Sequence, residues 1–110
     1  MKQAVDEKIS IEEVINLTIS EIKKAVKQVA PAYPVLRVDL FGSYAEGNNS
    51  EKSDVDLLVF FDEKVASLFD LSGLKMDMQD KLHTKVDVVA GPLRDGSFLI
   101  LNKRLKLYEA

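Results

Sequence analysis

The sequence predicts an α/β domain of two layers, a sheet and the helices that cover it, and three observations support this prediction. Segments with helical and strand-like spacing of apolar residues alternate along the chain. In the strand-like segments apolar residues recur at every second position, as expected where one face of a sheet is buried. The 110 residues, 46% of them hydrophobic, suffice for one core, so we expect a single domain over residues 1–110.

The first predicted helix runs from Ser10 to Val29. Ser10 and Glu13 match the capping-box pattern S-x-x-E, in which each side chain bonds a backbone N–H of the other residue. The apolar residues that follow recur at intervals of three and four. Pro31 and Pro34 would end this helix, because proline has no N–H to donate.

The remaining elements follow from the same periodicities and from the positions of turn residues. We expect a strand over residues 35–41, a loop with a short helical piece over 42–53, a strand over 54–61, a helix over 68–82, a strand over 85–90, a helix from Asp95 to about Arg104, and an extended tail over 105–108. Gly73 lies inside the helix over 68–82 and weakens it slightly.

The composition excludes several classes of function. Fifteen Lys and Arg against eighteen Asp and Glu give a net charge of −3, so the chain lacks the basic surplus for direct nucleic-acid binding. Without cysteine it has no disulfide, no cysteine zinc site and no thiol nucleophile. No apolar run approaches the roughly 18 residues of a membrane span, and the first ten residues lack a signal-peptide core. We therefore expect a cytoplasmic protein without membrane contact.

The two faces of the predicted sheet differ in charge. The apolar face would carry Leu36, Val38, Leu40, Val55, Leu57, Val59, Phe61, Val86, Val88 and Ala90, and the opposite face Arg37, Asp39, Asp54, Asp56, Lys85 and Asp87. Asp39 would pair with Arg37 or with a neighbouring strand. Asp54 and Asp56 would lie about 7 Å apart along their strand and repel, a cost that Mg²⁺ ions bound between them would offset. A solvated sheet edge is the alternative for this pair.

The loop before these carboxylates would suit a phosphate group. Gly42 and Ser43 directly follow a strand, where backbone N–H groups and a hydroxyl can face phosphate oxygens. Ten residues separate Ser43 from Asp54, enough for the chain to turn and bring the Asp pair beside the loop. A phosphate cradle beside a metal site describes a nucleoside triphosphate, although Gly-Ser taken alone is a very weak signal that indicates a simple turn.

The segment GSYAEGNNSEKSDVDLLVFF resembles the signature G-S-x10-D-x-D of the DNA polymerase beta-like nucleotidyltransferase superfamily. The separate segment VDVV, residues 86–89, resembles the strand that carries the third carboxylate of that family. The length and the tail RLKLYEA are similar to those of the smallest members, the minimal nucleotidyltransferases. The resemblance implies the nucleotidyltransferase fold, a mixed sheet packed on one face by helices.

The resemblance also implies a reaction and the residues that carry it. Asp54 and Asp56 would be shared ligands of two Mg²⁺ ions, and Asp87 would bind the catalytic ion, either as a ligand only or also as the base. Gly42 and Ser43 would hold the triphosphate of ATP or another nucleoside triphosphate. An acceptor hydroxyl would attack the α-phosphorus, and pyrophosphate would leave.

The small size implies that another protein supplies the acceptor. Minimal members of the family are commonly antitoxins paired with small helical HEPN toxins, and some transfer AMP to a tyrosine of the toxin. The alternatives are a non-catalytic antitoxin that occludes its partner, and transfer to a small molecule such as an aminoglycoside. Glu46 departs from the family pattern, because many minimal members have arginine there, and it places a negative charge near the phosphates.

Other side chains near the charged face carry separate expectations. Leu58, Phe60 and Val89 would form an apolar rim beside the carboxylates, open to a partner unless a C-terminal helix covers it. Tyr44 could stack on a nucleotide base, although cover of local apolar surface is the simpler role. His83 is expected to lie at a helix end without a catalytic role.

Overall fold

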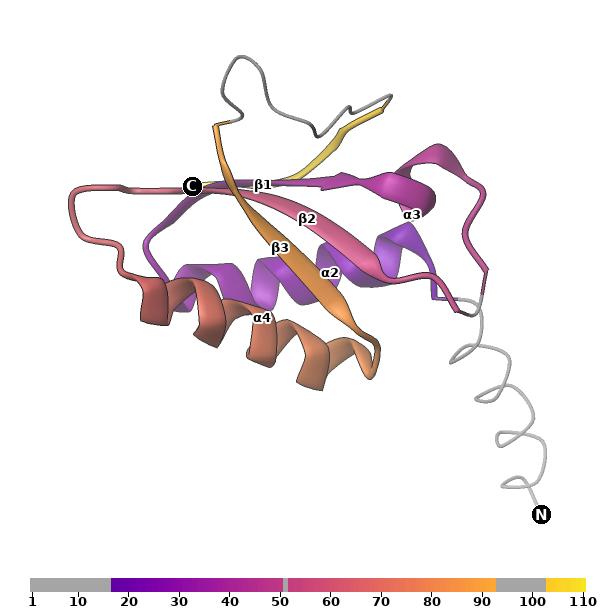
Figure 1. The fold of residues 1–110 in the computed structure, drawn as a ribbon, viewed down its shortest axis with the longest axis horizontal. Helices are drawn as coiled ribbons and strands as arrows, with labels where there is room; N and C mark the ends of the chain where they lie inside the picture. The colour runs from indigo at the N-terminus through magenta and orange to yellow at the C-terminus, as the bar shows by residue number, and fades with distance from the viewer. Residues whose placement is uncertain (1–16, 51, 93–102) are drawn as a thin grey trace.

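A four-stranded mixed sheet backed by two helices forms the fold in the computed structural model, which describes residues 17–50, 52–92 and 103–110 (Figure 1). The elements are α2 (Ile19–Val29), η1 (Ala30–Ala32), β1 (Val35–Phe41), α3 (Gly42–Glu46), β2 (Val55–Phe61), α4 (Leu68–Leu82), β3 (Val86–Gly91) and β4 (Leu105–Glu109). The strand order is β3-β2-β1-β4, with β2 and β3 parallel and the other pairs antiparallel. Helices α2 and α4 lie on the same face, so the predicted fold class is confirmed.

Helix α2 begins later than the sequence pattern predicts. Thr18 is its N-cap in an extended conformation, and its hydroxyl accepts a hydrogen bond from Glu21 N at 3.1 Å. Glu21 Oε1 accepts one from Thr18 N at 3.0 Å, which completes a capping box. Since Thr18 is not helical, a single helix from Ser10 to Val29 is wrong, and the expected box at Ser10 lies outside the described residues.

Replacing Thr18 with alanine should lower the free energy of unfolding by about 1 kcal/mol, because the backbone N–H of Glu21 loses the hydroxyl that accepts its hydrogen bond. Urea denaturation measures this loss. Ser20→Ala is the control, since Ser20 is exposed inside the same first turn. Equal effects of the two substitutions would contradict the assignment of Thr18 as the cap.

The core lies between the sheet and the two helices. Its buried residues include Ile22, Val26, Val38, Leu40, Val55, Leu57, Val59, Leu74, Met78 and Val86. Burial of each large apolar side chain contributes about 1.5–3 kcal/mol. The predicted apolar face is thus confirmed at its central positions, and the opposite face of the sheet is left for the carboxylates.

Two positions of the predicted apolar face are wrong. The β1–β2 register passes from Val35↔Phe61 to Arg37↔Phe60, so Leu36 is an extra residue in a β-bulge. Leu36 is therefore 50% exposed, and Val35 takes the core position instead. Ala90, near the end of β3, is also exposed.

The last part of the chain returns to the sheet. The expected tail is confirmed as strand β4, which pairs with β1. The expected helix from Asp95 lies mostly outside the described residues, and Arg104 at its end is not helical. No helix in the described part of the chain is long and apolar enough to span a membrane.

Candidate active site

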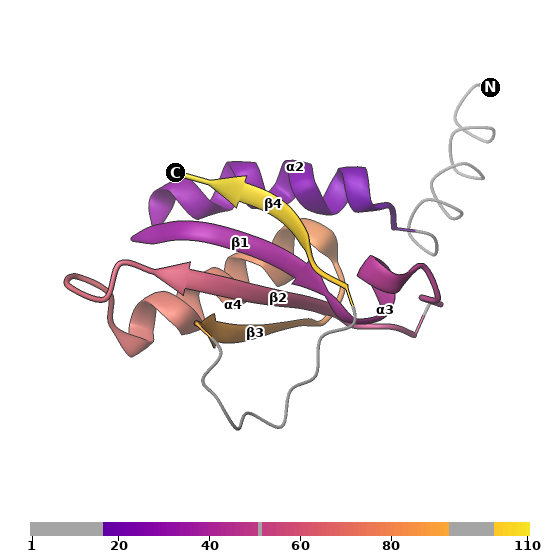
Figure 2. The ribbon, with the colours of Figure 1, turned by 90° about the horizontal axis from the view of Figure 1, so that it is seen from above.

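The strand register brings three carboxylates to one end of the sheet, on the face away from the helices. Asp56 in β2 is aligned with Asp87 in β3 and with Phe41 in β1. Asp54 immediately precedes β2, where Val55 N donates a hydrogen bond to Lys85 O at 3.0 Å. Helix α3 leaves β1 at this same end, as Figure 2 shows. The carboxylates and the Gly42-Ser43 loop therefore come together, as expected from their spacing.

Gly42 lies directly against the Asp56 carboxylate. Its φ is +75°, in the left-handed region, and a Cβ built on it would lie 2.2 Å from Asp56 Oδ2. Real Cβ contacts are not that short, so only glycine fits between the end of β1 and this carboxylate. The neighbouring Ser43, partly exposed at the start of α3, is thereby placed beside Asp56.

The charges around Asp56 favour its neutral form. Burial raises the pKa of this carboxyl above its ordinary value of 3.8, and the charges of Asp87 and Asp54 and a hydrogen bond with Asp87 raise it further. Lys85 acts in the opposite direction. Such a cluster is strained by repulsion unless a proton or a cation neutralises part of it.

Asp54 is held by a lysine that the sequence pattern did not single out for this role. Lys85 Nζ lies 3.6 Å from Asp54 Oδ2, and both side chains are partly exposed. The position of Lys85 on the charged face is visible from strand alternation. Its pairing with Asp54 depends on the parallel register of β2 and β3, which alternation alone does not give.

The three carboxylates have the right chemistry for a divalent cation but do not form a ready-made cage. In the described residues no three acidic, histidine or cysteine side chains converge as a metal site. Asp56 and Asp87 face each other across β2 and β3, and Asp54 is turned to Lys85. The donor set, carboxylate oxygens with open positions around them, is the one that Mg²⁺ prefers. Binding would require Asp54 to exchange Lys85 for the ion.

Because the pKa of Asp56 is raised in the folded chain, the free energy of unfolding should depend on pH. Between 3.8 and the raised pKa the folded chain binds more protons than the unfolded chain, so the free energy of unfolding falls as pH rises through this window. Thermal unfolding without metal, from about pH 3.5 to 7, should show this fall in wild type relative to Asp56→Asn. Parallel profiles of the two proteins would contradict it.

One expectation near the site is wrong. Leu58 is completely buried, and Phe60 and Val89 are half-buried, so they do not form an open apolar rim. The Arg37 guanidinium lies over the Phe60 ring, 5.7 Å from its centroid. Tyr44 is buried in the core, so its simpler expected role, cover of local apolar surface, is confirmed; burial raises its pKa.

Two other side chains near the site behave as expected. His83 ends α4 in a left-handed conformation (φ 53°), where its N–H donates to Gln79 O. Asp39 pairs with Arg37 at 2.8 Å.

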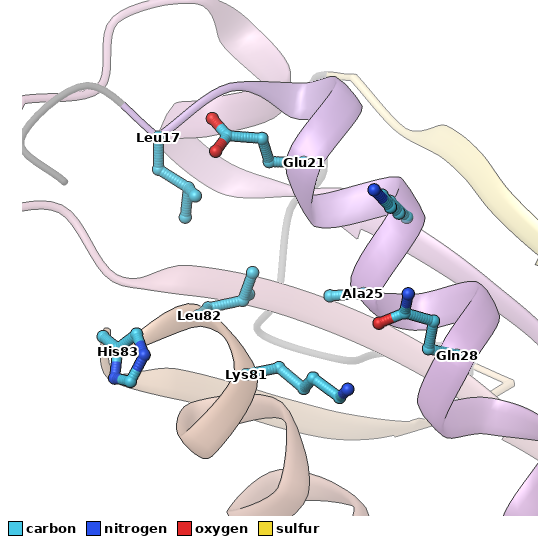
Figure 3. A pocket seen from close by; sticks show the side chains of 8 residues that line it. Leu17, Glu21, Ala25, Gln28, Lys81, Leu82 and His83 are labelled. Carbon is cyan, nitrogen blue, oxygen red and sulfur yellow. The ribbon is translucent and has the colours of Figure 1, made fainter. Parts of the chain in front are cut away.

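A cavity of about 310 Å³ lies on the opposite side of the sheet, between α2 and the end of α4 (Figure 3). It is lined by Leu17, Glu21, Lys24, Ala25, Gln28, Lys81, Leu82 and His83. Its single carboxylate, Glu21, is already engaged in the cap of α2. The cavity therefore offers no second acidic cluster, and the open face that carries Asp56 is the better candidate site.

Comparison with known proteins points to one family. Residues 19–107 match the nucleotidyltransferase domain family. A relative from Methanocaldococcus jannaschii, assigned to the protein adenylyltransferases, is 40% identical over 73 residues, which cover 66% of this chain and 77% of the relative. The protein adenylyltransferase MntA of Thermococcus cleftensis is 35% identical over 77 residues, covering 66% and 77%.

Solved structures with a similar fold include two antitoxin complexes. A toxin–antitoxin complex with AMP-PNP has a TM-score of 0.59 at 23% identity, covering 83% of this chain and 73% of that one. A tri-AMPylated HEPN toxin of Shewanella oneidensis with its MNT antitoxin has a TM-score of 0.56 at 21% identity, covering 82% and 71%. At these identities the likeness shows a common fold.

Proposed function

The chain belongs to the nucleotidyltransferase domain family, and from this premise we propose that it transfers AMP from ATP, with Mg²⁺, to a hydroxyl of a HEPN-type toxin, and so acts as an antitoxin. One observation carries the catalytic part of the proposal. Gly42 leaves room for the Asp56 carboxylate at the start of the Ser43 loop, and Asp87 lies on the other side of Asp56. The phosphate-binding loop, the metal ligands and the base would then lie side by side across the sheet, from β1 through β2 to β3.

Asp54, Asp56 and Asp87 would hold the magnesium ions, which would neutralise phosphate charge as the leaving group departs. The Gly42-Ser43 loop would bind the triphosphate from the β1 side of Asp56. Asp87, on the β3 side, would face the acceptor and could accept the proton of its hydroxyl.

The reaction then follows the row of residues across the sheet. The acceptor oxygen forms a bond to the α-phosphorus, the bond from that phosphorus to the bridging oxygen breaks, and pyrophosphate leaves with the electron pair. Transfer is favoured when these groups are held in line before reaction, which a rigid sheet achieves.

A protein acceptor is supported by the relatives and by the surface of this chain. The two relatives above are protein adenylyltransferases, and the Shewanella toxin is AMPylated in complex with its antitoxin. Apolar side chains before and along α4 are exposed, namely Val65, Leu68, Phe69 and Met76, and exposed apolar groups of this kind favour a protein contact. A small-molecule acceptor would not require them.

The test uses ATP labelled at its α-phosphate, Mg²⁺ and the chain together with its helical partner protein. Label should appear on the partner with wild type and with the control Asp80→Asn, whose side chain is exposed on α4, but not with Asp54→Asn. A chelator should also abolish labelling. Label on a small molecule instead would support the chemistry and contradict the protein acceptor.

The second candidate function is an antitoxin that acts by occlusion without catalysis. The pairing of Asp54 with Lys85 and the exposed Glu46 beside the loop favour it, because both oppose binding of a metal-bound triphosphate. This alternative would be supported if Asp54→Asn neutralised the toxin as well as wild type does and neither protein transferred label.

A further inference from the structure

A buried carboxylate lies on the charged face of the sheet outside the catalytic row. Asp39 in the middle of β1 is 0% exposed and is the buried charged residue of the described chain. Its Oδ1 accepts a hydrogen bond from Arg37 Nε at 2.8 Å. Its Oδ2 has no hydrogen-bond partner among the described residues, and Arg104 Nε lies 3.6 Å from it. Both arginines stay about 40% exposed at their side chains.

Stability does not account for this arrangement. A buried ion pair is often no more stabilising than apolar residues of the same volume, and removal of one partner leaves a costly buried charge. The neighbours of Asp39 along β1, Val38 and Leu40, are both in the core. A carboxylate at this position instead fixes two guanidinium groups at the surface of the charged face.

The register places Arg104 close to the loop that begins at Gly42. The pairing of β4 with β1 ends at Leu105 and Leu40, so Arg104, which immediately precedes Leu105, lies near the end of β1 that leads into Gly42. Asp56 is the partner of Phe41 on its other side. Arg104 therefore flanks the end of β1 from the side opposite to β2 and β3.

We propose that Arg104 binds the β- and γ-phosphates of the nucleoside triphosphate, and that Asp39 is a positioning residue that orients its guanidinium. This inference rests on the proposed function, because it concerns the same site. The ion pair with Asp39 uses Nε, which leaves the two terminal nitrogens for phosphate oxygens in the forked geometry that guanidinium favours. The guanidinium is anchored at Asp39 in β1, and β1 lies on the side of β2 away from Asp87, where the leaving pyrophosphate would be held.

Arg104 would also offset the negative charge that surrounds the proposed triphosphate site. The triphosphate would meet three carboxylates and Glu46, while Lys85 is paired with Asp54. The Arg104 guanidinium, held at Asp39 in the same strand that leads into Gly42, would supply the positive charge that Glu46 does not. Arg37 is placed differently, since it pairs with Phe60 in the ladder and lies over that ring.

The test compares the binding of AMP-PNP and of AMP, each with Mg²⁺, by calorimetry on the full chain. Arg104→Gln should weaken AMP-PNP binding by about 10- to 100-fold, the range of one or two charge-assisted hydrogen bonds, and leave AMP binding within about 2-fold. Asp39→Asn keeps the arginine but loses its anchor, so a smaller loss with the same preference is expected. Lys103→Gln, an exposed cation next in the chain, is the control and should change neither.

Arg104→Lys covers the case in which Arg104→Gln fails to fold, because it keeps a charge near Asp39 and loses only the fork. It should lose AMP-PNP affinity by several-fold and retain AMP affinity. Equal losses of affinity for AMP-PNP and AMP, or unchanged AMP-PNP affinity in both Arg104 variants, would overturn the role of Arg104. Binding of AMP-PNP by wild type would still support the nucleotide site. If wild type binds AMP-PNP no better than AMP, the inference fails; if it binds neither, the proposed function fails with it.

Discussion

Asp56→Asn should lower the rate of nucleotidyl transfer by about 10³-fold, the scale expected when a central electrostatic group is removed from such a site. Asp56 lies against Gly42 and is aligned with Asp87 in the neighbouring strand, so it is common to the phosphate loop and the third carboxylate. Release of pyrophosphate in the presence of the acceptor protein measures the rate.

The same substitution should not destabilise the metal-free fold. Burial and the charges of Asp87 and Asp54 already raise the pKa of Asp56, so a neutral amide removes an unfavourable charge. The melting temperature without Mg²⁺ should be equal or higher, which separates loss of chemistry from loss of structure. Glu63→Gln, an exposed residue after β2, is the control. A variant that kept a tenth of the wild-type rate would show that Asp56 is not essential.

The proximity of the loop and the first two carboxylates was predictable because it depends on local sequence. β1 and β2 are consecutive antiparallel strands, so the loop that leaves the end of β1 must come back beside the start of β2. This turn of the chain brings Gly42 and Asp56 to the same end of the sheet, and the observed register, with Phe41 opposite Asp56, puts them in contact. Alternation also put Asp87 on the charged face, but its place beside Asp56 required the parallel pairing of β2 with β3, and its role came from the family resemblance.

Features that depend on long-range contacts were not predictable from pattern. The bulge at Leu36 shifts one residue of β1 to the other face, and alternation cannot detect an inserted residue. Thr18 and Glu21 also match the capping-box pattern, but the continuous spacing of apolar residues gave no sign that a helix starts there. The burial of Asp39 depends on arginines from two strands, of which Arg104 lies far along the chain.

Gly42→Ala should destabilise the fold by about 2–4 kcal/mol, from backbone strain at φ +75° together with the collision between its Cβ and the Asp56 carboxylate. It should also abolish measurable nucleotide binding, because Asp56 can stay in place only if the end of β1 moves. Chemical denaturation and calorimetry with Mg-AMP-PNP measure the two effects. An alanine variant that binds the nucleotide as wild type does would show that the close packing of Gly42 on Asp56 has no part in the site.

Gly47→Ala separates strain from collision, because Gly47 has a similar φ of +82° but nothing within 4 Å of a built Cβ. It should cost only about 1 kcal/mol and leave nucleotide binding nearly intact. The excess cost at Gly42 should largely disappear when the Asp56 carboxylate is also removed, so Gly42→Ala and Asp56→Ala should be less than additive in stability. Additive effects would show that the cost of Gly42→Ala comes from backbone strain alone. The Asp56 carboxylate would then not be the reason that glycine is required at position 42.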